Sequence, residues 1–258
     1  MPGLYLHTGN SLNRLAERLS RLIKENPSEN PFEPEIILVQ SRGMQRWVSM
    51  RIAESLGVIS NCRFPFPNTF IHDLFECSLG VKPDKGYSPE RLTFRIMGII
   101  ESMLEDALFV QVKKYISDDK SCLKLVQLSR QIADAYDQYL VFRPDFILGW
   151  DSGKRFFAGG PEEKTEEWQA GIWNRITEEL SAHAVRLRQD FFLKIAAGKP
   201  DGLPGRISIF GISHLPYFHL EILRAYSTVT DVHLFLLNPC RQYWMEIENE
   251  KNIIKKAR

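Results

Sequence analysis

The stretch Pro34–Arg51, PEIILVQSRGMQRWVSMR, constrains the fold most, because it combines the patterns of a strand, a tight turn and a helix. Its unbroken apolar run, residues 36–39, is typical of a strand that is buried on both faces of a parallel sheet. Gly43 is available for the turn, and apolar side chains then recur at helical spacing, at Met44, Trp47, Val48 and Ile52. The stretch therefore predicts a βα unit of an α/β protein.

Polar and cationic side chains follow this predicted strand. Gln40 and Ser41 come directly after it, and Arg46 and Arg51 lie on faces of the predicted helix other than the apolar one. Ligands of open α/β sheets bind just outside the carboxyl ends of the strands. An amide, a hydroxyl and arginines at that position suit a nucleic-acid strand. The alternative is a plain βα unit whose polar turn is only solvated.

The first residues of the chain predict a second βα unit. Leu4–His7 suits a short strand, Thr8–Ser11 suits a turn, and the leucines that follow suit an amphipathic helix. A phosphate-binding loop needs the pattern GxxxxGK[ST], in which glycines admit the phosphates and lysine neutralises them. The turn here, HTGNSLNR, has one glycine and no lysine, so ATP binding is not expected. An atypical nucleotide hydrolase that uses Thr8–Ser11 stays an alternative.

The pattern of the chain changes after Gly80–Pro89, which is rich in glycine and proline and predicts a connection. Residues 83–200 predict an all-helical insertion. Strand patterns return at Arg206–Phe210 and Asp231–Leu237. The sequence thus predicts a parallel sheet that is begun, interrupted by helices and resumed. The helices expected in the insertion are Pro89–Ile116, Ser121–Phe142, Glu166–Leu180 and His183–Ala197.

The segment Cys62–Phe70 contains the string FPFPNTF and predicts an extended start, because its prolines disfavour a helix there. A helix is expected from Phe70 to Leu79, capped by Asn68 or Thr69. The phenylalanine rings of the string either belong to the core or leave one ring exposed to stack on a base.

Two carboxylates, Asp134 and Asp137, are three residues apart on one predicted helix, near Arg143. Side chains at that spacing share a helix face. They are either solvated or paired with Arg143, or they accept hydrogen bonds from the amino groups of bases.

Composition excludes several classes of function. The formal net charge of the 258 residues is +1, so nucleic-acid binding requires local basic patches. The four cysteines and six histidines are dispersed without metal-ligand spacing, which favours neither a zinc site nor a disulfide framework and fits a reducing compartment. We expect no signal peptide and no membrane span, and no nucleophile motif is present.

Several long strings occur in the order in which a known family carries them: NPFEPEIILVQSRGMQRWVSMRIAESLGV, FPFPNTFI, DAYDQYLVFRPDFI, GLPGRISIFGISHLP and LNPCRQYW. Together they resemble the N-terminal part of RecC, the gamma subunit of exodeoxyribonuclease V, the RecBCD helicase–nuclease. The resemblance implies a parallel-sheet α/β core like that of superfamily 1 helicases, related to P-loop NTPases but without the ATPase motifs. The implied domains are residues 1–82 and 201–258, which form the core, and residues 83–200, a helical insertion.

The resemblance also implies a function. This part of RecC would guide the 3′-ended single strand of DNA and scan it for the Chi recombination signal during double-strand break repair. It would be cytoplasmic, have no ATPase or nuclease site, metal or cofactor of its own, and assemble with a RecB-type helicase–nuclease and a RecD-type helicase. The implied DNA-binding residues are Gln40, Ser41, Arg46, Phe66, His72, Asp134, Ala135, Asp137, Arg143 and Arg186.

Two of these residues depart from the family pattern. Arg46 stands where relatives carry an amide, and His72 stands where they carry a tryptophan, which leaves open which DNA sequence is recognised. A purely architectural module that only packs on a partner helicase subunit stays a further alternative.

Overall fold

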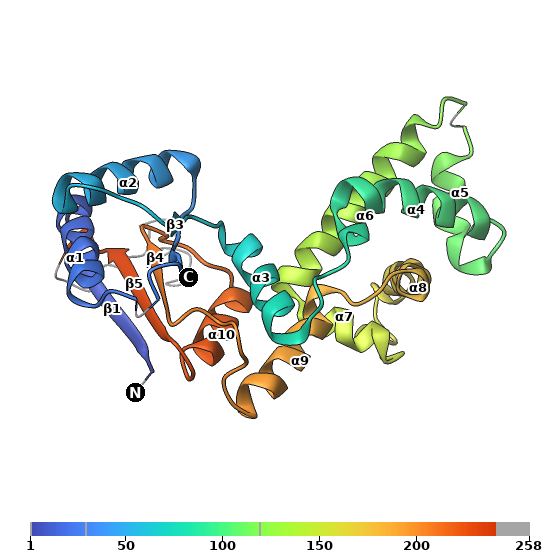
Figure 1. Cartoon of the computed structure of the whole chain (residues 1–258). Coiled ribbons are helices and arrows are strands. Elements are labelled where there is room, and N and C mark those ends of the chain that lie inside the picture. The colour runs from blue at the N-terminus through green and yellow to red at the C-terminus, as the bar shows by residue number, and fades with distance from the viewer. Residues whose placement is uncertain (1, 29, 119, 241–258) are drawn as a thin grey trace, which may run out of the picture. The chain divides into compact units, whose positions relative to one another are not determined.

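The computed structural model describes residues 2–28, 30–118 and 120–240 (Figure 1). The end of the LNPCRQYW string and the end of the third predicted domain lie outside these residues. The described chain forms two compact units. We call residues 2–67, 204–215 and 226–240 the sheet unit, and residues 68–203 and 216–225 the helical unit.

The sheet unit is built on a five-stranded sheet of order β1-β5-β4-β2-β3, in which every neighbouring pair is parallel. This confirms the prediction of an α/β protein whose parallel sheet is begun early in the chain and resumed late. The strands are β1 (Leu4–Gly9), β2 (Glu35–Leu38), β3 (Cys62–Arg63), β4 (Arg206–Phe210) and β5 (Asp231–Leu237).

One face of the sheet is covered by α1 (Leu12–Glu25) and α2 (Arg42–Leu56), which also contact each other. Leu19 and Val48 from these helices are fully buried against Ile37 of β2. Trp47 packs partly buried against this core, as its helical spacing predicts. The alternation of side chains along the strands explains the arrangement, since residues two apart face the same side of a sheet.

A column of rings runs along the β1–β5 pair on the sheet. Tyr5 stacks on His233 at 4.7 Å between ring centroids, and His7 stacks on Phe235 at 4.5 Å. His7 Nε2 and His233 Nδ1 are 3.0 Å apart and share a hydrogen bond. That bond requires one nitrogen to accept, so it is lost when both imidazoles are protonated.

Acidification is expected to destabilise the sheet unit through this pair. Burial lowers the pKa of His233 to about 4, with His7 and Arg206 acting in the same direction and Asp231 opposing them. Between about pH 6.5 and about pH 4 the unfolded chain therefore binds the proton that folded His233 rejects, so stability is complete above this window and falls through it. The expected loss between about pH 7 and about pH 4.5 is about 2 kcal/mol, measured by urea unfolding. In His233→Phe this pH dependence should shrink by that amount, and an unchanged dependence would show that the pair has no such role.

The helical unit contains the remaining helices, among which α4 and α6 lie side by side (Figure 1). Its core is aromatic: Tyr136, Trp150 and Trp173 are fully buried, and Tyr136 meets both tryptophans edge-on. The helices are α3 (Pro67–Leu79), α4 (Pro89–Met103), α5 (Val110–Ile116), α6 (Leu123–Phe142), α7 (Pro144–Asp151), α8 (Glu163–Glu179), α9 (Ala184–Ala196) and α10 (Tyr217–Tyr226), with short 3₁₀ turns at Lys85–Tyr87 and Ala107–Phe109.

Two boundaries differ from those that the sequence predicts. The single helix expected over Pro89–Ile116 is wrong: α4 ends at Met103, and the carboxylate of Asp106 accepts the N–H of Leu108 at 3.0 Å, which starts a separate 3₁₀ turn. The helix expected from Phe70 begins three residues earlier, at Pro67, because proline is tolerated in the first turn of a helix.

The two units of the structure differ from the predicted domains in which segments they contain. Residues 68–82 and 216–225 belong to the helical unit rather than to the α/β part. The domain boundaries at residues 82 and 200 stay predictions.

Candidate nucleic-acid interface

The strand order places a topological switch point between β2 and β4. The chain leaves β2 for β3 on one side of the sheet and leaves β4 for β5 on the other. Leu38 pairs with Ile209, and the chain emerges two residues later at Gln40 and Gly211. Adjacent strands whose connections diverge in this way open a crevice at their carboxyl ends, where ligands of α/β proteins bind.

Gly211 lets the backbone at this edge pack closely against α2. Its φ is +66°, a backbone conformation that side chains disfavour, and a Cβ there would lie 3.2 Å from Cε of Met44. Its N–H donates to the carbonyl of Phe235 at 3.0 Å. A glycine is therefore required where β4 ends beside the start of α2.

The three predicted residues at this edge have different environments. Gln40 is exposed beyond the end of β2. Ser41 is also exposed, but its Oγ accepts the N–H of Met44 at 3.1 Å and so caps α2. Arg46 is exposed on α2 and makes no ion pair among the described residues, whereas Arg51 pairs with Glu54 at 2.8 Å. Of these three predicted residues, Gln40 and Arg46 are thus the ones whose side chains are available to a ligand.

The phenylalanines of the FPFPNTF string divide between core and surface. Phe64 packs partly buried against the core of the sheet unit, and Phe70 is buried in α3. Phe66 is 40% exposed, so its ring is accessible for stacking on a base.

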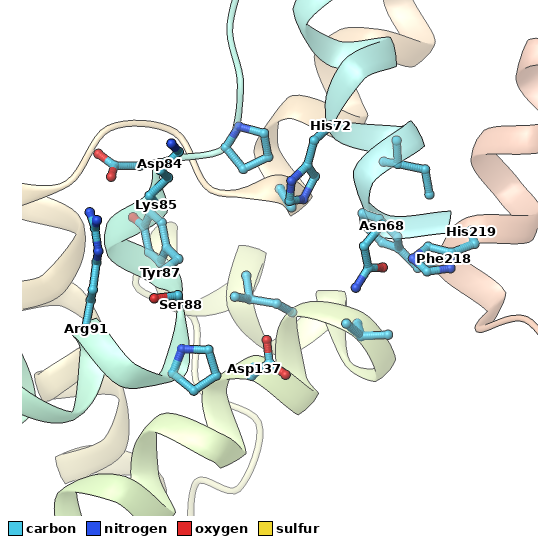
Figure 2. A pocket seen from close by; sticks show the side chains of 16 residues that line it. Asn68, His72, Asp84, Lys85, Tyr87, Ser88, Arg91, Asp137, Phe218 and His219 are labelled. Carbon is cyan, nitrogen blue, oxygen red and sulfur yellow. The ribbon is translucent and has the colours of Figure 1, made fainter. Parts of the chain in front are cut away.

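A cavity of about 450 Å³ lies within the helical unit (Figure 2). It is bordered by residues from α3, the 3₁₀ turn at Lys85–Tyr87, α4, α6 and α10, and it brings together the predicted residues His72 and Asp137. Its other polar side chains include Asn68, Lys85, Arg91 and His219. A cavity of this size with a few converging polar groups is typical of a small-ligand site.

The electrostatics of the cavity keep its imidazoles neutral at neutral pH. Burial lowers the pKa of His219 to about 4, and the neighbouring His72 adds to the effect. Burial also lowers the pKa of His72, against the opposing charge of Asp73. The pKa of Asp137 is raised, first by burial and then by the charges of Asp134 and Glu90. The two imidazoles therefore offer neutral donors and acceptors beside the carboxylates of Asp84 and Asp137.

Arg143 lies where α6 passes into α7, and its partner is a neighbour in sequence. Its Nε and Nη2 donate to the two carboxylate oxygens of Asp145 at 3.1 and 2.9 Å, and its guanidinium lies 3.6 Å from the ring centre of Phe146. The alternative of a salt bridge between Arg143 and Asp134 or Asp137 is therefore wrong. Asp134 is exposed on α6.

Ala135 lies apart from that cavity. It borders a shallow groove of about 190 Å³ between α6 and α8, together with Tyr136, Trp168 and Gln169. The structure therefore does not bring Ala135 to the same pocket as Asp137, although both are on α6.

Arg186 is held beside a buried network. Its side chain is 57% exposed, and its Nη2 lies 3.5 Å from Oδ2 of Asp151. Asp151 also accepts from Nε2 of His183 at 2.8 Å and from Nε1 of Trp173 at 3.0 Å. His183 Nδ1 accepts the backbone N–H of Arg186 at 3.3 Å, so its proton is on Nε2. The network fixes the start of α9 and with it the position of Arg186.

Sequence reasoning missed most of the cavity. Asn68, Lys85, Arg91 and His219 come from segments that no motif joins. Of these four residues, Asn68 alone was singled out from the sequence, as a candidate helix cap.

Two other kinds of site are absent from residues 2–28, 30–118 and 120–240. No group of three or more histidine, cysteine, aspartate or glutamate side chains in this part of the chain could hold a metal ion. None of the helices in this part has the length and apolar character to cross a membrane.

Comparison with known proteins identifies the family. The family described as "RecC, N-terminal domain" matches residues 4–258. The chain is 34% identical over 261 residues to the RecBCD enzyme subunit RecC of Escherichia coli (strain K12), covering 98% of this chain and 23% of that protein. It is 34% identical over 269 residues to the subunit of the same name from Haemophilus influenzae, covering 95% and 24%, and 28% identical to that of Mycolicibacterium smegmatis, covering 96% and 22%.

The fold and these sites define an α/β protein with an all-parallel sheet and a separate helical unit. The chain belongs to the RecC family and matches the N-terminal domain of that family over nearly its whole length. The resemblance that the sequence strings indicated is thereby confirmed. The chain spans about a quarter of the length of these relatives.

Proposed function

We propose that this chain is the non-catalytic, helicase-like DNA-binding part of a RecC subunit of exodeoxyribonuclease V. In this role it guides the 3′-ended single strand and scans it for the Chi recombination signal during double-strand break repair. It works in the cytoplasm, assembled with a RecB-type helicase–nuclease and a RecD-type helicase. The sheet unit is the helicase-like core without ATPase motifs, and the helices over residues 83–200 are its insertion.

The observation that carries the proposal is that Gln40 lies just beyond the end of β2, at the switch point between β2 and β4, and that Arg46 is exposed on the helix that follows. A switch point is where an α/β sheet binds its ligand, and Arg46 has no ion-pair partner among the described residues. A neutral amide suits base edges and an unpaired guanidinium suits phosphate, which together are the groups of a DNA strand.

A second support comes from the helical unit. His72 and Asp137 share one cavity, and Arg143 and Arg186 are exposed with their guanidinium groups held by aspartates. An aspartate offsets the charge of each of these guanidinium groups, but each group keeps further N–H donors that a phosphate can accept, so attraction for phosphates is local on a chain of net charge +1.

The test is single-strand binding by the Arg46→Ala/Arg143→Ala double variant of this chain. We expect its affinity for a labelled oligodeoxynucleotide to fall about tenfold, and the slope of log affinity against log salt to become shallower by about 0.7 per lost phosphate contact. Fluorescence anisotropy over a salt series measures both quantities. The matched control is Arg14→Ala/Arg130→Ala, which removes one exposed arginine from each unit without touching the proposed interface.

The two possible failures have different meanings. If the double variant binds like the control, the two arginines have no role in strand binding. If the unsubstituted chain does not bind single strands even at low salt, the DNA-binding proposal is wrong for this chain, and an architectural module that packs on a partner subunit is favoured.

A further inference from the structure

One wall of the cavity in the helical unit carries an unsatisfied polar side chain. His219 of α10 is 5% exposed, and its ring borders the cavity beside Phe218 (Figure 2). Nδ1 of His219 is buried and has no hydrogen-bond partner among the described residues. A buried polar atom without a partner destabilises the fold unless a ligand or water satisfies it. With a pKa near 4, the ring is neutral and offers one donor and one acceptor.

The opposite wall suits an anion. α4 begins there at Pro89, and Ser88 at its N-cap makes no side-chain capping bond, so the first N–H groups of this helix lack that partner. Such N–H groups and the helix dipole favour negative charge. Lys85 and Arg91 border the same side, are exposed, and form no ion pair in the described part of the chain. Figure 2 shows Lys85, Ser88 and Arg91 on one side of the cavity and Asn68, Phe218 and His219 on the other.

The two carboxylates of the cavity, Asp84 and Asp137, differ in whether they can bind a ligand. Asp84 already accepts the N–H of Gly86 at 2.8 Å and the hydroxyl of Ser181 at 2.9 Å, so its oxygens are used by the protein. Asp137 lies between the two walls in Figure 2 and makes no hydrogen bond within the described part of the chain, so it can accept one from an amino group. Asn68, which faces the same space, can both donate and accept.

We propose that this cavity takes up one nucleotide of a single strand. The phosphate lies at the start of α4 between Lys85 and Arg91, and the base lies against Phe218, with Asn68 and His219 at its polar edge. Asp137 accepts from the exocyclic amino group, so adenine and cytosine are preferred over thymine. The inference rests on the proposed single-strand function. It adds to that function a compartment for a base that is turned out of the strand. The binding residues of this compartment are Lys85, Arg91, Asn68 and His219.

The first test uses free nucleotides, so that it does not depend on the rest of the strand. Binding of dAMP, dCMP and dTMP to the chain is measured by saturation-transfer NMR. We expect dAMP and dCMP to bind and dTMP to bind more weakly. His219→Phe keeps an aromatic ring but removes both nitrogens, and it should weaken dAMP and dCMP about fivefold, the effect of one hydrogen bond. His214→Phe, at an exposed histidine of the sheet unit, is the matched control.

A second variant fills the cavity. Val141→Trp places a large side chain on its α6 wall and should abolish nucleotide binding, whereas Val126→Trp, at an exposed position of the same helix, should leave it unchanged. Circular dichroism shows whether each variant keeps its helices. A series of oligonucleotides, each with one abasic position at a different place, tests the same point in single-strand binding. For the unsubstituted chain, affinity should fall when the abasic position is at one particular place. For Val141→Trp, no place should lower the affinity.

The outcomes separate this inference from the function on which it rests. If single strands bind, but His219→Phe and Val141→Trp bind dAMP and strands like their controls, the nucleotide compartment is wrong and the DNA-binding function stands. If the unsubstituted chain binds neither single strands nor nucleotides, both proposals are wrong. Nucleotide binding that is lost only in the cavity variants supports the compartment.

Discussion

Replacing Glu166 by alanine is expected to lower the free energy of unfolding of the helical unit by about 3–5 kcal/mol. Glu166 is 4% exposed, and its carboxylate accepts the N–H groups of Trp150, Phe156 and Phe157, each at 2.9 Å. Alanine leaves these donors without an acceptor in a buried place. Urea unfolding followed by tryptophan fluorescence measures the change, and Trp150 reports the site directly.

Two comparisons make this prediction specific. Glu166→Gln keeps one acceptor oxygen and should lose about half as much stability, while Glu178→Ala on the same helix breaks only an exposed pair with Arg175 and should change stability by about 0.5 kcal/mol or less. Burial opposes the charged form of Glu166, but the hydrogen bonds outweigh it and its pKa is lowered. Its contribution is therefore present above the unfolded pKa and is lost as the pH falls through the folded one, and Glu166→Ala should lack that acid dependence. A variant as stable as Glu178→Ala would show that the carboxylate does not hold this loop.

The second large effect is expected at Asp151, where stability and strand binding should change together. Asp151→Ala removes the acceptor of the buried N–H groups of Trp173 and His183, and we expect a loss of about 3 kcal/mol. It also removes the carboxylate that holds Arg186. Loss of that negative charge favours an anionic strand, but we expect the lost placement of Arg186 to outweigh this gain, so single-strand affinity should fall, though less than in Arg186→Ala. Arg186→Ala itself should leave stability nearly unchanged, because that side chain is 57% exposed.

Asp151→Asn and Asp190→Ala are the controls for this experiment. The amide oxygen of asparagine can still accept one of the two buried donors, so about half of the stability should remain. Asp190 is exposed on α9, and its removal changes the charge by the same amount without touching the network. Because removal of a negative charge by itself favours binding of an anionic strand, strand affinity that rises equally in Asp151→Ala and Asp190→Ala would mean that general charge, and not the placement of Arg186, is responsible.

The sequence predicted those elements whose burial is evident from their apolar residues. β2 contains an unbroken apolar run, and β4 and β5 are apolar except at Arg206, Ser208, Asp231 and His233. Strands buried on both faces are typically rich in apolar residues in this way. The end of α4 was missed because the apolar spacing continues through Asp106, whose side chain starts a new turn by a local hydrogen bond. Periodicity detects the apolar face of a helix but does not detect such a competing bond.

A candidate site could be predicted only where its residues are close together in the sequence. Gln40 and Arg46 lie on one strand–turn–helix unit, so their place at the sheet edge follows from the local pattern. Asn68 and His219 meet because α3 and α10 both border one cavity, and no local pattern joins them. Glu166 stands in the charged segment EKTEEWQAG, so the local sequence suggests an exposed side chain. The tertiary structure shows that it is a buried hydrogen-bond acceptor.

The strand order has a consequence for synthesis on the ribosome. β1 and β2 are made first, yet β1 pairs with β5 and β2 pairs with β4, both of which follow more than a hundred residues later. Among the early strands that the structure describes, the local pairing is that of β2 with β3. The closing of loops of this length before any pairing makes such sheets slow to form. The nascent chain thus carries unpaired strands while its helices emerge, and unpaired strand edges are the part of an incomplete chain that is prone to aggregate.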